Sequence, residues 1–161
     1  MWFKREKTPD ITAADPACRR AAVEAGLVGQ NVLRRLLHHD SDASVRAAAA
    51  RRLQDLVLLR TALEQDPDRG VRESARSRYR QLLAGGDILA MHYRQSALRA
   101  CQDPQIIAHV ARSAREPSLR TLAVARLDDI QLLSEVAEHD TSPAVRAEAA
   151  ARLDRLSCKR N

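Results

Sequence analysis

The fold is decided by the stretch Asp40-Ser41-Asp42-Ala43-Ser44-Val45-Arg46-Ala47-Ala48-Ala49-Ala50-Arg51-Arg52-Leu53. Its core pattern, an apolar residue followed by Arg-x-x-Ala-x-x-Arg-Leu, begins again at Leu119 and at Val145. Degenerate copies begin at Val71 and Tyr93. Self-similarity at a fixed interval of this length is the signature of stacked structural repeats.

One arginine, the residue after the first apolar position, marks each copy. The marker arginines are Arg20, Arg46, Arg72, Arg94, Arg120 and Arg146, at intervals of 26, 26, 22, 26 and 26 residues. The copy around Arg20 is the weakest. Four equal intervals with the flanking residues in register predict about six units with a period of 26.

Capping residues divide each unit into two short helices. Side-chain acceptors that satisfy free backbone N–H groups stand four positions before the marker, at Asp42, Asp68, Glu116 and Ser142. A second set of N-cap positions stands nine residues after it, with the acceptors Asp55, Asp103 and Asp129 and with Gly29, which has no side chain. Prolines directly after several of these caps fit the first helical position, where a missing N–H costs nothing.

Composition indicates an all-α protein with a thin core. The chain has 161 residues, of which 45% are hydrophobic but only 2% aromatic, so leucine, alanine and valine must form the interior. Val45, Ala49 and Leu53 fall on one side of a helix. Helices this short are unstable alone, so we expect antiparallel pairs that stack on their neighbours.

The motif D-x-D-x-x-V-R-x-x-A-x-x-R-L, carried best by 40–46 and 66–72, resembles the short form of HEAT-type helical repeats. The likeness covers 15–156 and implies an armadillo-like solenoid, a right-handed α-α superhelix with a concave and a convex surface. A nearer likeness, suggested by 71–85, is to a bacterial family of unknown function whose repeats precede a coiled coil. The sequence departs from that family by stopping at Asn161 before any coiled-coil region, so we expect either a short stand-alone member or a fragment of a longer protein. Members of the HEAT class mostly bind proteins, and a few bind nucleic acid.

The domain organisation follows from these intervals. We expect an N-terminal cap at 1–14, where Trp2 and Phe3 could cover the first repeat, then the repeat domain at 15–156 and a tail at 157–161. The interval of 22 predicts an irregular joint near 84–94. There a first helix should run on to Gly85-Gly86, and Asp87 should cap a helix over 88–101.

The marker arginines predict a structural ladder between repeats. Each arginine should bond to the acid that closes the preceding unit, because stacking needs a recurring contact. The expected ladder residues are Arg46 with Asp40, Arg72 with Asp66, Arg146 with Asp140, and Arg120 in the same slot. The alternative is a row of arginines that face a ligand.

Positive charge gathers in one segment. The net charge of the chain is +6. The segment 69–99 contains seven arginines and two acidic residues, so its own net charge is +5. Arg69, Arg72, Arg76 and Arg80 follow helical spacing, and with Arg99 they form a candidate binding stripe. Such a stripe could contact phosphates or an acidic partner, although charge runs are more often a solvated face.

The sequence favours a non-catalytic protein without cofactors. It has no Gly-rich phosphate loop, zinc spacing or catalytic triad. Three widely spaced cysteines fit a reducing cytoplasm, and no apolar run is long enough to span a membrane. We expect a scaffold for a protein or peptide partner, with nucleic acid as the alternative. Leu153 and Leu156 in the last unit have no second helix to cover them, which favours self-association.

Overall fold

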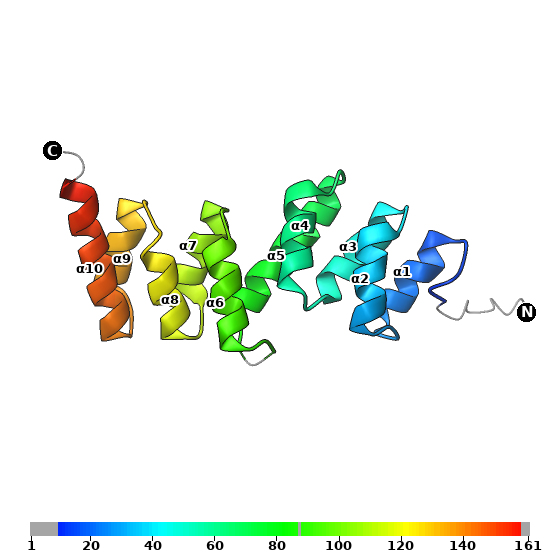
Figure 1. Cartoon of the computed structure of the whole chain (residues 1–161), viewed down its shortest axis with the longest axis horizontal. Helices are drawn as coiled ribbons and strands as arrows, with labels where there is room; N and C mark the ends of the chain where they lie inside the picture. Colours follow the sequence, from blue (N-terminus) through cyan, green and yellow to red (C-terminus); the bar gives the residue numbers. More distant parts are fainter. Residues whose placement is uncertain (1–9, 87, 159–161) are drawn as a thin grey trace, which may run out of the picture. The chain divides into compact units, whose positions relative to one another are not determined.

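The computed structural model of the chain describes residues 10–86 and 88–158, and this part forms ten α-helices and no strand (Figure 1). The all-α prediction is therefore confirmed. Contacts divide the chain into two compact units, the first ending at Tyr79 and the second starting at Arg80. The helices are α1 (Pro16–Glu24), α2 (Gln30–His39), α3 (Ala43–Arg52), α4 (Leu56–Gln65), α5 (Arg69–Ala84), α6 (Met91–Ala100), α7 (Pro104–Ser113), α8 (Pro117–Val124), α9 (Ile130–His139) and α10 (Pro143–Cys158).

Helices pack in sequential order within each unit, which is consistent with a helical repeat. The helices that carry the motif, here called first helices, are α1, α3, α5, α6, α8 and α10; the second helices are α2, α4, α7 and α9. In the first unit α3 packs on both α1 and α2. In the second unit α8 packs on α6, α7 and α10, while α9 packs on α7 and α10. First helices therefore stack on first helices, and second helices on the first helix that follows.

The predicted second-helix starts are all confirmed. Their N-caps are Gly29, Asp55, Asp103 and Asp129. The Asp55 carboxylate accepts from two N–H groups of the first turn of α4, at 3.0 and 3.1 Å. Gly29 has no side chain to offer, and Glu116 makes no cap bond at the start of α8. The short aspartate side chains thus reach the free N–H groups at their helix starts, whereas the longer Glu116 at the start of the first helix α8 does not.

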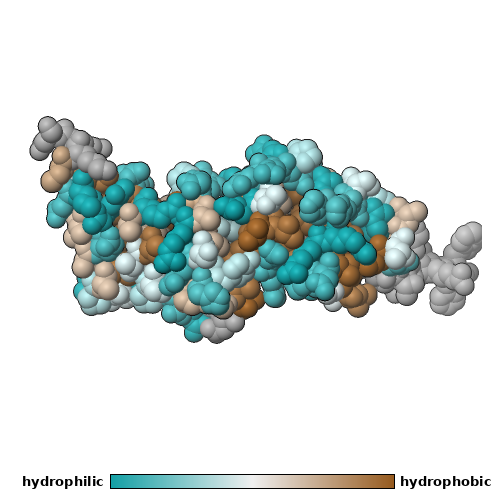
Figure 2. All heavy atoms as spheres, viewed as in Figure 1, coloured by the Kyte–Doolittle hydropathy of each residue, from teal (hydrophilic) through white to brown (hydrophobic). Residues whose placement is uncertain are grey.

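The core is the layer of small apolar residues that the motif predicts. Val45, Ala49 and Leu53 are fully buried, and so are Val71, Ala75 and Tyr79 in the next first helix. Alanine in the middle of each first helix lets neighbouring backbones approach closely. The face drawn in Figure 2 mixes a predominantly hydrophilic surface with separate small hydrophobic areas.

The irregular joint has the expected helix end but a different helix start. Helix α5 ends at Ala84, and the Gly85 N–H donates to the Gln81 carbonyl at 2.9 Å. The next helix, α6, begins at Met91 and not at Ile88, because Ile88 lies in a turn and its N–H donates to the Gly86 carbonyl. The predicted cap Asp87 lies outside the described residues, as do Trp2 and Phe3.

The last described helix is a first helix. Helix α10 continues through Ser157 to Cys158, so the first two residues of the predicted tail are helical. Leu153 is half-buried, whereas Leu53 and Leu127 in the same slot are buried. Leu156 is half-buried too. Self-association through these two leucines stays a prediction.

Candidate functional site

The marker arginine joins two aspartates. Nε and Nη2 of Arg46 donate to the two carboxylate oxygens of Asp66, at 2.9 and 3.0 Å. Its Nη1 donates to the backbone carbonyls of Asp40 and Ser41, at 3.0 and 3.3 Å. One guanidinium therefore ties Asp66, the residue that follows its own second helix, to the loop that leaves the preceding helix pair.

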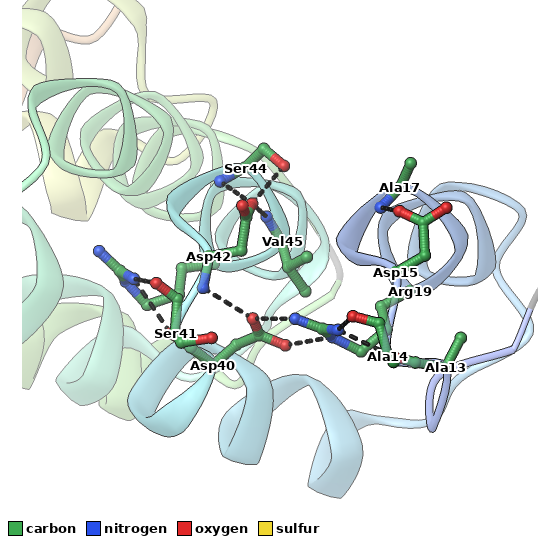
Figure 3. Close-up of polar contacts among 11 residues, drawn as sticks. Ala13, Ala14, Asp15, Ala17, Arg19, Asp40, Ser41, Asp42, Ser44 and Val45 are labelled. Atoms are coloured by element: carbon green, nitrogen blue, oxygen red, sulfur yellow. Dashed lines mark hydrogen bonds and ion pairs between the residues drawn. The ribbon is translucent and has the colours of Figure 1, made fainter.

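The same bonds recur. Arg19 holds the Asp40 carboxylate at 2.8 Å through both Nε and Nη2, as Figure 3 shows. In the second unit Arg120 holds Asp140 at 2.8 and 2.9 Å. We call these residues the Arg–Asp network. Its members are Arg19, Asp40, Arg46, Asp66 and Arg72 in the first unit, and Arg120, Asp140 and Arg146 in the second.

The predicted pairing was wrong in its direction. Arg46 takes the carboxylate of Asp66, which closes its own unit, and not that of Asp40. The Asp40 carboxylate is already occupied by Arg19, so Asp40 offers Arg46 only its carbonyl. For the same reason Arg72 bonds the Asp66 carbonyl and Arg146 the Asp140 carbonyl, each at 2.7 Å. The expected contact between repeats exists, but it runs through the backbone.

In the first copy the marker is Arg19, one residue before Arg20. The loop after α1 contains one extra residue, which Gly26 accommodates at φ 77°. Arg20 is exposed and lies 3.8 Å from Glu24 on the next turn of the same helix. The signal in the sequence was the N-cap Asp15, which stands four positions before Arg19 as Asp42 stands before Arg46.

These bonds shift the acidity of the aspartates. The bonds from Arg19 hold the pKa of Asp40 below its usual value, and those from Arg120 do the same for Asp140. Burial raises the pKa of Asp66, but the bonds from Arg46 and from the Asp68 N–H outweigh it, and the net shift is downward. The Arg–Asp network therefore stabilises the ionised form of these aspartates.

The sequence analysis includes a second recurring arginine in the motif but does not predict its role. It is the arginine before the final leucine of the motif, and it bonds a backbone carbonyl at the end of the preceding first helix. Nε of Arg78 donates to the Leu53 carbonyl at 2.9 Å, and Nε of Arg152 to the Leu127 carbonyl at 2.8 Å. The other members are Arg52, which bonds Glu24, and Arg126, which bonds Leu98 and Cys101. Its recurrence in four copies of the motif was the available signal, although Ala100 fills this slot in the copy that begins at Tyr93.

The candidate stripe is only partly exposed. Arg69 on α5 and Arg99 on α6 are exposed. Arg72 is half-buried and belongs to the Arg–Asp network. Arg76 and Arg80 are half-buried as well, and their Nε atoms are fully buried. Whether these side chains bind anything stays a prediction.

Consecutive second helices form a groove that recurs in both units. Between α2 and α4 it is lined by Leu37, His38, Leu58, Thr61, Ala62, Gln65 and Asp66. Between α7 and α9 it is lined by Ala111, Arg112, Glu135, Val136, His139 and Asp140. Counted back from Asp66 and Asp140, six lining positions coincide. The repeat thus reproduces a groove as well as a core.

Within the described residues no three His, Cys, Asp or Glu side chains gather in a way that could hold a metal ion. None of the described helices is both long enough and apolar enough to cross a membrane.

Comparisons of the chain with protein-family models, curated proteins and solved structures found no match. What the chain is shown to be is therefore an all-helical protein of sequentially packed short helices, consistent with a helical repeat.

Proposed function

We propose that this chain is a HEAT-like α-α superhelical scaffold that binds a polypeptide along its second helices and catalyses no reaction. The observation that carries the proposal is the groove between α2 and α4, which returns in register between α7 and α9. A surface feature that recurs at matching positions of the motif suits an extended partner. Stacked repeats generally bind partners along extended surfaces of this kind.

The side chains of the groove fit a polypeptide. Its floor is apolar in both copies, with Leu58 and Ala62 in one and Ala111 and Val136 in the other. Its rims differ: Thr61 in the first copy is replaced by Glu135 in the second. A constant apolar floor accepts apolar side chains of a partner, while variable rims select their polar neighbours.

The recurring polar residues support a non-catalytic role. The arginines and aspartates that return in every clear copy form bonds within the protein, as in the pair Arg46–Asp66. The recurrence of these side chains is accounted for by the bonds that stabilise each repeat, and it requires no catalytic role. A catalytic site would instead need titratable groups gathered in one cleft.

A peptide-display selection tests the proposal. Peptides selected from a random library on the intact chain should lose affinity for Thr61→Trp, because an indole fills the exposed groove position. We expect a loss of about tenfold or more, equivalent to about 1.4 kcal/mol. The matched control is Glu73→Trp, since Glu73 is also exposed but lies on the first helix α5. If no peptide is selected, or both variants bind alike, the proposal fails.

Nucleic-acid binding is the alternative, favoured by the excess of positive charge at 69–99. Exposed Arg69 and Arg99 are the members of the candidate stripe best placed to reach phosphates. Such binding should weaken steeply as salt rises, because it releases counterions. Random DNA and RNA titrated at low salt should bind the wild type and bind Arg69→Ala/Arg99→Ala more weakly. Undetectable binding of the wild type would remove this alternative.

A further inference from the structure

Helix α10 carries a marker arginine whose bonding pattern is incomplete. In the complete pattern, Nε and Nη2 of Arg46 and of Arg120 hold the carboxylate of the aspartate that closes the same unit, at 2.8–3.0 Å. Arg146 makes the other part of the pattern, because its Nη1 donates to the Asp140 carbonyl at 2.7 Å. Among the described residues, its Nε and Nη2 have no bonding partner. The half that should hold a carboxylate is therefore unused.

Nothing near Arg146 in the second unit can complete the pattern. The Asp140 carboxylate is already held by Arg120, and one of its oxygens also accepts from the Ser142 N–H. Within residues 10–86 and 88–158 no second helix follows α10 to bring another closing aspartate. The residues three and four positions away, which share a helix face with Arg146, are not acidic. They are Ser142, Pro143, Ala149 and Ala150.

The apolar residues beside Arg146 are uncovered as well. Ala150 is exposed, whereas Ala50 and Val124 in the same slot are fully buried. Leu153 is half-buried. The spacing of Arg146, Ala150 and Leu153 places all three on one side of the helix. We call this surface the open face of α10.

Arg72 on α5 also donates its Nη1 to two carbonyls, and α5 is also followed directly by a first helix. It has no comparable open face. The slot of Leu153 is filled there by Tyr79, which is fully buried, and the slot of Ala150 by the half-buried Arg76. An unused guanidinium beside uncovered small apolar residues is thus a property of α10.

The second unit shows what covers the equivalent face of α8. There Arg120, Val124 and Leu127 are 8%, 0% and 4% exposed. Helix α10 packs on both α8 and α9, and Asp140, the residue that follows α9, holds Arg120. The cover of this face is therefore a second helix with its closing aspartate, followed by a first helix.

We propose that the open face of α10 binds a helical segment of another protein, in which an aspartate directly after a helix pairs with Arg146. A guanidinium suits this partner because its parallel N–H groups match the two carboxylate oxygens. Apolar residues of the same segment would cover Ala150 and Leu153. The inference goes beyond the proposed function, since none of these three residues lines either groove.

A second copy of this chain does not meet the requirement. The closing aspartates that the structure describes already use their carboxylates within the chain. They are Asp40 with Arg19, Asp66 with Arg46, and Asp140 with Arg120. The partner must therefore bring a closing aspartate that is not yet paired.

The probe is a fluorescently labelled peptide of residues 129–157, which contains a second helix, its closing Asp140 and most of a first helix, but lacks Arg120. Titrated into the intact chain, it should give saturable binding by fluorescence anisotropy. Asp140→Asn in the peptide should weaken binding by about tenfold or more, because it removes the charge from the pair. Arg146→Lys in the protein should cause a similar loss, since lysine keeps the charge but not the parallel N–H groups.

Two further measurements separate this pair from general effects. Asp140→Asn combined with Arg146→Lys should lose little more than either change alone, because both remove the same interaction. Ala150→Trp should also weaken binding by about tenfold or more, because the indole obstructs the open face. The matched control is Ala144→Trp, an exposed position on another side of α10, which should retain binding. Circular dichroism of each variant verifies that the helices are intact.

Four results would overturn the inference. The first is no saturable binding of the unaltered peptide, and the second is an equal loss in Ala150→Trp and Ala144→Trp. The third is full additivity of Asp140→Asn and Arg146→Lys. The fourth is dimerisation of the chain alone that Ala150→Trp abolishes, which would assign the face to a second copy. None of these results decides the proposed function, because the display experiment depends on Thr61 in the groove of the first unit.

Discussion

Replacing Arg46 with alanine is expected to destabilise the first unit far more than an ordinary surface substitution. The change removes two bonds to the Asp66 carboxylate and two to the carbonyls of Asp40 and Ser41. It also leaves the Asp66 carboxylate without its countercharge in a position that is only 9% exposed. An ionised group in such a place depends on its partner.

The magnitude follows from the burial of the pair. The side chains of Arg46 and Asp66 are 12% and 9% exposed, so solvent screens their interaction weakly. Removing one partner from a buried pair costs about 3–5 kcal/mol. We expect Arg46→Ala to fall in this range, and Asp66→Asn to cost about 1.5–3 kcal/mol, the contribution of a hydrogen bond to a charged group. Against a total stability of about 5–15 kcal/mol, such losses are easily measured.

The assay is a double-mutant cycle of urea unfolding, followed by circular dichroism. Arg46→Ala, Asp66→Ala and the double variant should give a coupling energy above about 1 kcal/mol, since contacting groups are not additive. The control cycle uses Arg20 and Glu24, an exposed pair 3.8 Å apart, for which we expect about 0.2–1 kcal/mol. A coupling for Arg46 and Asp66 no larger than in the control would refute the structural role of the network.

Three further outcomes are expected. Ala49→Leu should destabilise by about 1–3 kcal/mol in urea unfolding because Ala49 is fully buried, whereas Ala147→Leu at an exposed position should have little effect. Gly29→Asp should stabilise by a few tenths of a kcal/mol, since it supplies the missing cap of α2 and an added Cβ meets no atom within 4 Å; a loss of stability would contradict this. The bonds from Arg120 hold the pKa of Asp140 below its ordinary value of 3.8. This aspartate therefore contributes stability that is present above about pH 4 and is lost as the pH falls through its folded pKa. Asp140→Asn should flatten this acid dependence of the unfolding free energy, and an unchanged profile would contradict the bond.

The helices and their caps could be predicted from the sequence because both are local properties. Asp55 and Asp103 bond N–H groups two and three residues away, so the residue type and its place in the period were sufficient. The burial of Ala49 and Leu53 followed from spacing for the same reason. The start of α6 at Met91 was missed because a turn at Ile88 competes with the helix there.

The contacts between helices were harder to predict because they depend on which partner is already occupied. Spacing alone could not show that Arg19 takes the Asp40 carboxylate and leaves Arg46 only the carbonyl. The pocket that Arg51, Arg52 and Arg78 help to line was missed for a related reason, because only the packing of α5 near the end of α3 brings Arg78 to the other two arginines.

Because each closing aspartate uses its carboxylate for one arginine and its carbonyl for the next, the Arg–Asp network can be shortened by whole repeats. Removing the 26 residues 41–66 would join Asp40 directly to Pro67, the residue that now follows Asp66. Asp40 would keep Arg19 on its carboxylate and receive Arg72 on its carbonyl. Both interactions would survive with no new side chain required, so a lineage of such chains can change its length by single repeats without redesigning the joints.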